Sequence, residues 1–383
     1  MKVLQQVYVS QPGARQDVVP LATLNPQLVL VFAGPQQLAN PQLHQQLRSA
    51  LPDAVLAGCS TAGEICAQGV LENSIVITAV RFESDARVAA ARAEVRAMED
   101  SYAAGRRLGE LLEPTGLRAI LLFGKGVEIN GSALIDGLVQ VIGANIPITG
   151  GLGGDNGAFH STYTLTTDGV SRSAVVAVGL YGEHLAVGHG SYGGWSAFGP
   201  VRRVTRCDGN ILYELDGAPA LQVYKNYLGE YARDLPASGL LFPFEMLRED
   251  QSSVGLIRTI LGIDEEQGSL ILAGDIDPNG FLRLMHTTTD GLVDGAEEAA
   301  RRTLASMTAE RGDGLALLVS CVGRKLVMGD QVEEEVESVT AQLGADVTVT
   351  GFYSYGEISP FASATDCKLH NQTMTITLLG ERP

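Results

Sequence analysis

Apolar and polar residues follow two patterns along this chain, and in its last third the two patterns take turns. Residues 290–307 place apolar side chains at helical spacing with charged side chains opposite, and residues 315–323 form the continuous apolar run of a buried strand. A second amphipathic helix is predicted up to Gly344, and a second strand over residues 347–352. Residues 371–379 then alternate threonine with apolar residues, which predicts a strand with one buried face.

The same order of elements is predicted earlier in the chain. Two strands, a helix, a strand, a helix and two more strands are expected over residues 74–82, 86–95, 101–112, 118–124, 132–143, 146–149 and 173–181. The first eighty residues give a shorter version, with strands at 28–32, 54–58 and 74–80 and a helix at 42–51. A unit of strand, helix, strand, loop and strand is therefore predicted three times, which indicates an internal repeat.

A glycine-rich loop with an acidic residue is predicted in each unit. The loops read GCSTAGEI, GGLGGDNG and GFYSYGEI, and they place carboxylates at Glu64, Asp155 and Glu357. Glycine lets a strand turn sharply and brings backbone N–H groups close to whatever lies beside it. The acid then either binds a ligand's amine or accepts hydrogen bonds from its own loop. Turn chemistry alone explains glycine and short polar residues, which favours the second alternative.

The stretch between the second and third units differs in composition. Residues 190–258 are rich in glycine, proline and tyrosine and hold the only tryptophan, Trp195, and one helix is predicted there from Pro219. A hairpin is predicted over residues 269–289. Because 383 residues suggest two domains, we predict domains at 1–190 and 191–383, with the junction within 190–225. The predicted fold class is α/β with mixed α+β sheets, in which the glycine-acid loops of both halves face a shared cleft.

Charge and cysteine content exclude several classes of function. The formal charge of -17 leaves no basic surface for nucleic acid or for an anionic membrane. No segment approaches the ~20 apolar residues that span a bilayer, and the N-terminus lacks a signal peptide's apolar stretch, so a soluble cytoplasmic protein is expected. The five cysteines are scattered without a C-x-x-C motif, so no zinc site is predicted and reduced, buried thiols are expected.

Catalytic and cofactor motifs are weak. GGLGGDNG does not have the G-x-G-x-x-G spacing and is followed by a threonine-rich strand pattern, which excludes a dinucleotide site. Ser60, Cys59 and Cys321 are candidate nucleophiles, but no G-x-S-x-G elbow surrounds them and no histidine lies close in sequence to act as a base. His184 and His189 lie five apart, and on one strand they would face opposite sides, which makes them a poor metal-binding pair. Binding without turnover is therefore favoured over an amidase-like hydrolase.

The polar residues that remain lie mainly on glycine-rich loops and at strand ends. Hydroxyls, guanidinium groups and carboxylates that converge there suit recognition of a small polar or zwitterionic molecule, because each charged end needs a partner once it is desolvated. The candidate ligand-binding residues are Ser60, Thr61, Glu64, Gly151, Asp155, Arg258, Arg324, Tyr353, Tyr355, Glu357, His370 and Asn371.

Seven phrases in order resemble the FIST proteins, whose two parts are the FIST N and FIST C domains. They are GCSTAGEI, GGLGGD, ELDGAPAL, IRTILGIDEEQGSLILAGDI, CVGR, GFYSYGEISP and LHNQTMTITLL, spread over nearly the whole chain. The resemblance implies an intracellular sensory module that binds a small ligand such as an amino acid. It also implies a separate signalling partner, such as a histidine kinase or a cyclic-dinucleotide enzyme, because no output-domain signature is found in the sequence.

The resemblance also leaves a haem-binding alternative open. Some FIST proteins are described as haem-binding nitric-oxide sensors that act on a histidine kinase, and haem b would need an axial histidine. His189 or His184 is the expected ligand because both precede the aromatic segment with Tyr192, Trp195 and Phe198, although those aromatics equally suit packing at a domain junction. Where the family often has histidine before Gly-Trp, this chain has glycine at position 193, and nothing in the sequence excludes the histidines at 160 and 286.

Overall fold

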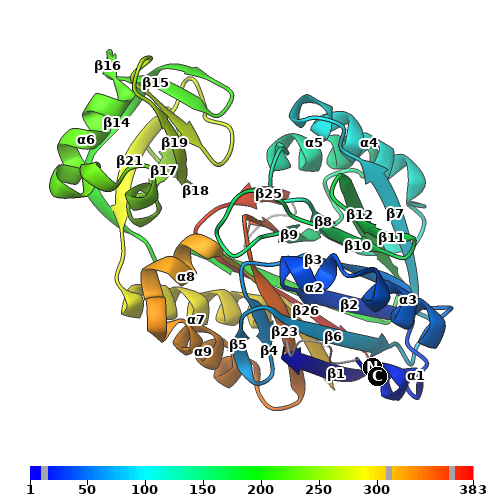
Figure 1. Cartoon of the computed structure of the whole chain (residues 1–383). Coiled ribbons are helices and arrows are strands. Elements are labelled where there is room, and N and C mark those ends of the chain that lie inside the picture. Colours follow the sequence, from blue (N-terminus) through cyan, green and yellow to red (C-terminus); the bar gives the residue numbers. More distant parts are fainter. Residues whose placement is uncertain (10–15, 308–312, 362–366, 383) are drawn as a thin grey trace.

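The computed structural model describes residues 1–9, 16–307, 313–361 and 367–382. Within these residues the strands form four mixed or antiparallel sheets. Three sheets make one body, in which the N- and C-termini lie close together, and the fourth sheet stands beside that body (Figure 1). The amino group of Met1 lies 2.9 Å from the carboxylate of Glu381, which agrees with that placement of the termini.

Each sheet of the three-sheet body has six strands among the described residues. The first runs β1 (Lys2–Val9), β6 (Ser74–Arg81), β2 (Leu28–Ala33), β3 (Val55–Ser60), β10 (Thr164–Thr166) and β11 (Gly169–Ser171). The second runs β25 (Cys367–His370), β24 (Gly356–Pro360), β9 (Ile148–Leu152), β8 (Leu117–Gly124), β12 (Ala174–Tyr181) and β7 (Arg87–Glu94). The third runs β13 (Leu185–Tyr192), β26 (Met374–Glu381), β22 (Gly314–Cys321), β23 (Val347–Ser354), β4 (Glu64–Cys66) and β5 (Gly69–Leu71).

The predicted threefold repeat is confirmed, and it includes an exchange of hairpins that the pattern did not predict. In each unit a parallel strand pair is followed by a short hairpin, and that hairpin pairs with a sheet built mainly by another unit. The first unit's β4–β5 joins the third sheet, the second unit's β10–β11 joins the first sheet, and the third unit's β24–β25 joins the second sheet. The exchange ties the three units to one another through backbone hydrogen bonds.

The helices connect the strands of each unit. Those of the first unit are α1 (Val19–Ala22), α2 (Pro35–Leu38) and α3 (Pro41–Ala50), and those of the second are α4 (Ser101–Leu111) and α5 (Gly131–Ile142). The third unit has α7 (Thr289–Ser306), α8 (Val322–Met328) and α9 (Glu333–Leu343), and short 3₁₀ turns η1 (Met98–Asp100) and η4 (Gly329–Gln331) precede α4 and α9. None of the helices in the described ranges is long and apolar enough to cross a membrane.

Each unit has a glycine at the same position in the second strand of its parallel pair, and the packing of the strands explains why glycine recurs there. Gly58, Gly150 and Gly351 lie so close to the neighbouring strand that an added Cβ would stand 1.9, 2.2 and 1.8 Å from its carbonyl oxygen. Such distances are far inside van der Waals contact, so only glycine fits. We call these three residues the repeat glycines.

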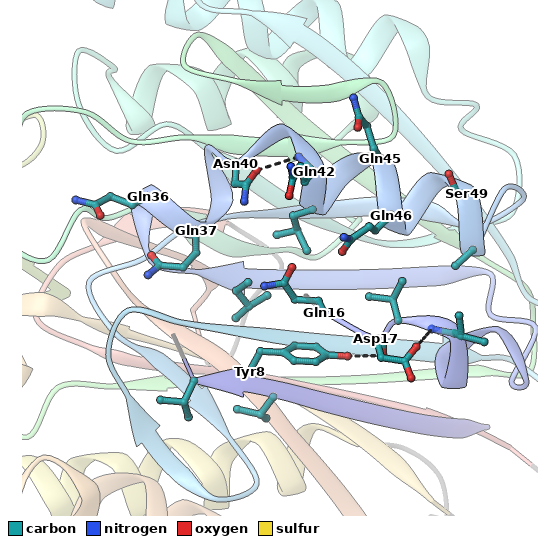
Figure 2. Close-up of a pocket in the computed structure, with 17 residues that line it drawn as sticks. Tyr8, Gln16, Asp17, Gln36, Gln37, Asn40, Gln42, Gln45, Gln46 and Ser49 are labelled. Carbon is teal, nitrogen blue, oxygen red and sulfur yellow. Dashed lines mark hydrogen bonds between the residues drawn. The ribbon is translucent and has the colours of Figure 1, made fainter. Parts of the chain in front are cut away.

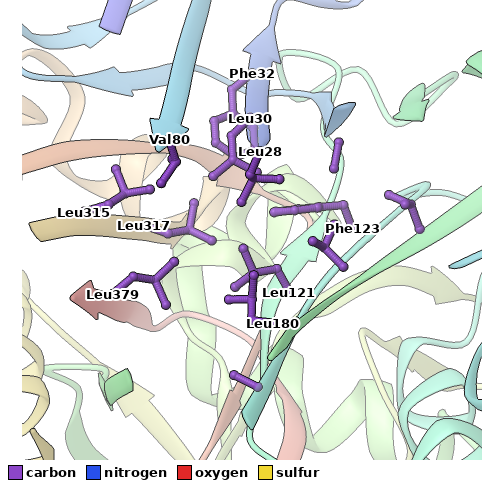
Figure 3. Close-up of a cluster of buried hydrophobic side chains, with 14 of the residues drawn as sticks. Leu28, Leu30, Phe32, Val80, Leu121, Phe123, Leu180, Leu315, Leu317 and Leu379 are labelled. Carbon is purple, nitrogen blue, oxygen red and sulfur yellow. The ribbon is translucent and has the colours of Figure 1, made fainter. Parts of the chain in front are cut away.

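The three sheets share one apolar core (Figure 3). Phe32 of the first unit stacks on Phe352 of the third with ring centroids 4.7 Å apart, and Phe123 of the second unit meets Phe32 edge-on at 5.6 Å. Leu315 and Leu379 come from the last third of the chain and join the same cluster. Burial of side chains from all three units in one cluster makes them parts of a single body.

The fourth sheet is an insertion in the third unit, between β13 and α7, and we call it the inserted sheet. Its strand order is β18 (Ser253–Arg258), β17 (Phe244–Leu247), β21 (Phe281–His286), β14 (Ser196–Asp208), β15 (Ile211–Leu215), β20 (Ser269–Leu272) and β19 (Ile260–Asp264), with β16 (Ala218–Pro219) beside β15. Helix α6 (Ala220–Leu228) packs on it with its own apolar cluster, and η2 (Gly229–Asp234) and η3 (Ala237–Leu241) follow.

Two predictions from the sequence concern the inserted sheet and its start. The predicted hairpin over residues 269–289 is wrong, because β20 pairs with β15 and β19 whereas β21 pairs with β14 and β17. Turn residues between two apolar runs cannot show that each run has a better partner elsewhere. The expected domain boundary after residue 190 falls inside β13, which pairs along its length with β26.

Candidate ligand-binding site

The carboxylate of Glu64 accepts hydrogen bonds from residues of its own unit. Its Oε2 accepts hydrogen bonds from the backbone N–H and the hydroxyl of Ser74 at 2.9 and 2.7 Å, and its Oε1 accepts one from the hydroxyl of Thr61. Glu64 has no exposed surface. Burial raises the pKa of this carboxyl, and the three donors act in the opposite direction.

Glu357 repeats this arrangement in the third unit. Its Oε2 accepts from the N–H and the hydroxyl of Thr373 at 3.2 and 3.1 Å, and its Oε1 accepts from the hydroxyl of Ser354 at 2.6 Å. The side chain is fully buried, and burial raises the pKa of the carboxyl to about 8. Both glutamates therefore hold the start of the last strand of their unit, β6 or β26, against the loop.

The second unit departs from this pattern. Glu64 and Glu357 each lie opposite the residue that follows a repeat glycine, and in the second unit that register position is held by Thr164, opposite Cys59. The Thr164 hydroxyl is buried and has no hydrogen-bond partner among the residues that the structure describes. Asp155, predicted as the third equivalent acid, lies instead in a longer connection: residues 153–163 separate β9 from β10.

Asp155 stabilises this longer connection, which we call the second-unit loop. Its two carboxylate oxygens accept hydrogen bonds from the backbone N–H groups of residues 159, 160 and 161, each at 2.8 Å. Tyr355 reaches over from the third unit and donates its hydroxyl to Asp155, and the same hydroxyl accepts from Gly157 N–H at 2.9 Å. The ring of Tyr355 stacks on Phe159 with centroids 4.1 Å apart. The loop is thus ordered by a partner from another unit.

A cleft of about 660 Å³ opens beside the second-unit loop. The three-sheet body lines it with Met98, Gly126, Val127, Glu128, Ile129, Asn130, Gly131, Leu152, Gly157, Phe159, Leu326, Tyr355 and Leu369. The inserted sheet and its connections line it with Asn210, Asp234, Leu235, Pro236, Ala237, Leu240, Ile260, Leu261, Leu272, Ala273, Gly274 and Asp275. Most of these side chains are apolar, a few are polar, and the volume is in the usual range for a small-molecule site.

Three hydrogen bonds link the body to the inserted sheet around this cleft. Arg258 donates to the carbonyl oxygen of Leu369 at 3.2 Å, and the amide of Gln372 donates to that of Leu240 at 3.0 Å. The third is a longer contact of 3.4 Å from the Asn130 amide to the Asp275 carboxylate. Because residues of both parts line the cleft, a bound molecule would touch both parts at once.

The remaining predicted site residues are not part of the cleft lining, and most of them are bonded within the protein. Ser60 donates to the carbonyl oxygen of residue 154 at 2.8 Å and accepts from the N–H of residue 163 at 2.9 Å. Gly151 lies in β9 opposite residue 357. His370 is buried 2.9 Å from the carbonyl oxygen of residue 359, and burial lowers the pKa of its ring to about 4. Asn371 is buried with its Oδ1 unpartnered.

Arg324 and Tyr353 belong to a buried network with Glu335. Arg324 pairs with the Glu335 carboxylate at 3.0 and 2.7 Å, and Tyr353 donates to the same carboxylate at 2.6 Å. Burial next to this anion raises the pKa of the Tyr353 hydroxyl. Arg324 also donates to the carbonyl oxygens of Gly193 and Leu292, so it holds the point where the chain leaves β13 for the inserted sheet.

The predicted nucleophiles are buried, whereas the predicted haem ligand His189 is half-buried. Burial raises the pKa of the Cys59 and Cys321 thiols. His184 is exposed beside Asp85. Partial burial lowers the pKa of His189, whose Nδ1 has no hydrogen-bond partner in the described part of the chain. No cluster of metal-ligating side chains occurs among the described residues.

Haem would need an axial ligand beside an apolar slot. The described lining of the cleft contains no histidine or cysteine. Trp195 donates its indole N–H to the carbonyl oxygen of Gln372, and Tyr192 packs under Arg302. The described residues therefore do not fit haem at this cleft.

A second, larger hollow of about 1490 Å³ lies on the first unit. Figure 2 shows that many amide side chains line it, among them Gln36, Gln37, Gln42 and Gln46 of α2 and α3, with Tyr8 of β1 on another side. We call this hollow the groove; two of its lining residues, Val9 and Gln16, flank in the sequence residues 10–15, which lie outside the described residues. We therefore base the candidate site on the cleft, whose walls come from several described elements.

Comparison with known proteins gives two tandem family matches. The FIST N domain matches residues 27–218, and the FIST C domain matches residues 220–360. An uncharacterised protein of Methanocaldococcus jannaschii is 26% identical over 218 residues, which cover 53% of this chain and only 41% of that protein. The crystal structure of a cyanuric acid hydrolase from A. caulinodans is similar over 100% of this chain and 99% of its own, with a TM-score of 0.41 and 9% identity. A likeness this weak carries no argument about activity.

Proposed function

Because the chain belongs to the FIST family, whose domains are sensory domains in signal transduction, we propose that it senses a small organic molecule in the cleft between the three-sheet body and the inserted sheet. The observation that carries the proposal is the composition of the cleft: its walls are mainly apolar, polar groups are few, and they come from both parts of the molecule. An apolar amino acid is one ligand of suitable size.

The position of the cleft supports a sensory role. A ligand that contacts both parts changes the free energy of their relative arrangement by its differential affinity for the arrangements available. The inserted sheet joins the body through residues 193–195 and 287–288. Thr287 donates to the carbonyl oxygen of Gly194 at 2.8 Å, so the two connections also contact each other. The signal then passes to a separate protein, such as a histidine kinase or a cyclic-dinucleotide enzyme.

Turnover is not part of this proposal. A hydrolase needs an accessible nucleophile with a base in hydrogen-bond reach. The hydroxyl of Ser60 is already bonded on both sides, and the thiols of Cys59 and Cys321 are buried with a raised pKa. Incubation of the protein with each ligand that binds, followed by mass analysis of the ligand, tests this point: a product would contradict it.

The ligand site can be tested by filling the cleft. Thermal-shift screening of amino acids and amines gives candidate ligands, and calorimetry gives their affinities. Ala237 is an exposed lining residue, and Ala237→Trp should weaken binding at least tenfold by occupying the cleft. Ala67→Trp, at an exposed alanine of the first unit's hairpin, is the matched control and should change nothing. Equal affinity in both variants would reject the cleft as the site.

A further inference from the structure

The charged groups of the cleft are all of one sign. Glu128, Asp234 and Asp275 lie in its described lining, which contains no lysine, arginine or histidine. Asp234 forms no hydrogen bond or ion pair within the described part of the chain. Asp275 accepts only the 3.4 Å contact from the Asn130 amide, through one of its two side-chain oxygens. Carboxylate oxygens thus remain available to a ligand.

Two cationic side chains, Arg258 and Lys125, lie behind the cleft and outside its described lining. Arg258 lies behind residues 274 and 275, but its guanidinium donates to the backbone carbonyl oxygens of residues 257, 275 and 369. Lys125 is buried behind the cleft with its ammonium 3.7 Å from the Glu128 carboxylate. Neither side chain lines the cleft, so an anionic ligand group would find no cationic side chain in the described lining.

Apolar and aromatic side chains of the cleft suit an apolar or aromatic part of a ligand. Phe159 and Tyr355 form a stacked pair there, and Leu240 and Ile260 line the same cleft from the inserted sheet's side. Aromatic faces attract cations as well as apolar groups. The formal charge of -17 adds a long-range attraction for cations.

We propose, on the basis of the sensory function proposed above, that the ligand is an amphipathic amine: an apolar body with an ammonium group that binds the Asp275 carboxylate, with Asp234 at the rim. A ligand whose only charge is a carboxylate is excluded by the same groups. An amino acid binds through its ammonium group and gains nothing from its carboxylate.

A matched series of ligands tests the class. An ethylammonium group, an alcohol, a propanoate and an α-amino acid group are each carried on phenyl, naphthyl and decyl bodies, and affinities are measured by calorimetry at low salt. On a given body the amine should bind about ten- to a hundredfold more tightly than the alcohol, as expected for one charge-assisted hydrogen bond. The propanoate should bind most weakly.

Variants locate the interaction. Asp275→Asn should weaken binding of the amine about tenfold and leave the alcohol within twofold. Asp208→Asn removes the same charge from an exposed position of the inserted sheet outside the cleft and should leave both affinities unchanged. An amine that binds no better than its alcohol, or equally well to Asp275→Asn, would overturn the ligand class while the cleft remains the site. Failure of every body to bind, or binding that Ala237→Trp does not weaken, would reject the proposed site as well.

Discussion

The glycine-acid loops of the first and third units differ in kind from the loop of the second unit. In the first and third, a buried glutamate accepts three hydrogen bonds from its own unit, and a few residues connect the strands. In the second, Thr164 stands at the glutamate's register position, and residues 153–163 extend to the edge of a cleft. The glycine-acid sequence shared by the first and third units has a structural role. The candidate site lies in the second unit, where the loop departs from the repeat.

A second departure from the repeat supplies the other wall of the candidate site. The inserted sheet interrupts the third unit between β13 and α7, and its residues form the other wall of the cleft. Residues that the repeat preserves are therefore expected to control folding, and residues at the two departures from the repeat are expected to control binding. The following substitutions test this division.

The largest effect is expected at a repeat glycine. Gly351→Ala would place a methyl group 1.8 Å from the carbonyl oxygen of Leu318 and force the parallel strands apart. We expect a loss of more than about 4 kcal/mol of unfolding free energy, or no folded protein. Gly157→Ala in the second-unit loop meets no atom within 4 Å and has only its φ of +83° against it, so it should cost about 1 kcal/mol. Urea unfolding followed by circular dichroism compares the two, and equal losses would contradict the division.

Glu357 should give stability a pH dependence of definite sign. Its folded pKa of about 8 lies above the ordinary carboxyl value of about 4.3, so the folded state holds a proton that the unfolded state releases between these pH values. Its contribution to the free energy of unfolding is complete below about pH 4.3 and falls by up to ~1.4 kcal/mol per pH unit until pH passes 8.

Glu357→Gln resembles the protonated acid and removes this dependence. Wild type should therefore lose stability relative to the variant as pH rises from 5 to 8, and urea titrations at several pH values measure the difference. A difference that stays constant with pH would show that the buried carboxyl titrates normally.

Tyr355→Phe should weaken ligand binding as well as folding. The variant keeps the ring that stacks on Phe159 and loses the hydroxyl that joins Asp155 to the N–H of Gly157. We expect about 1–2 kcal/mol of lost stability and a tenfold weaker ligand affinity, because the second-unit loop loses its partner. Tyr353→Phe, which loses a hydroxyl in the buried Glu335 network, should destabilise without changing affinity. The reverse pattern would place the site elsewhere.

The smallest effect is expected at Thr164. Its buried hydroxyl has no hydrogen-bond partner within the described ranges, so Thr164→Val should be neutral or stabilising by up to about 1 kcal/mol. Thr373→Val removes a hydroxyl that binds Glu357 and should destabilise by about 1–2 kcal/mol. Thermal unfolding of both variants is sufficient to compare them. A larger loss at Thr164 would mean that its hydroxyl has a structural role.

Sequence pattern predicted the repeated units well, because strand alternation and helical spacing are local properties. Residues 290–307 fold as their pattern indicates. Over residues 371–379 the strand is confirmed from Met374 onward, but the expected single buried face is wrong, because the threonine face of β26 is buried as well. The exchange of hairpins could not be predicted, because the partner of a three-residue strand such as β10 is set by packing between units. The register of Thr164 was missed for the same reason, since the acid at position 155 stands in the sequence where an equivalent of Glu64 was expected.

The site itself was mostly invisible in the sequence. Of the predicted ligand-binding residues, Tyr355 lines the cleft, while Asp155 orders the loop beside it and Arg258 supports Asp275. Phe159, Asn130 and the residues around Leu240 were missed, because apolar and amide side chains carry no chemical signature. One usable signal was present: the greater length of the second-unit loop relative to its two counterparts marks a departure from the repeat.

Hydrogen exchange tests most directly whether the ligand binds at the two departures from the repeat. Exchange is measured by mass spectrometry with and without a saturating ligand from the screen. We expect the ligand to slow amide exchange in residues 126–131 and 153–163 of the second unit and in residues 234–240 of the inserted sheet. Exchange in the groove formed by α2, α3 and β1 should not change. Protection confined to that groove would contradict this expectation.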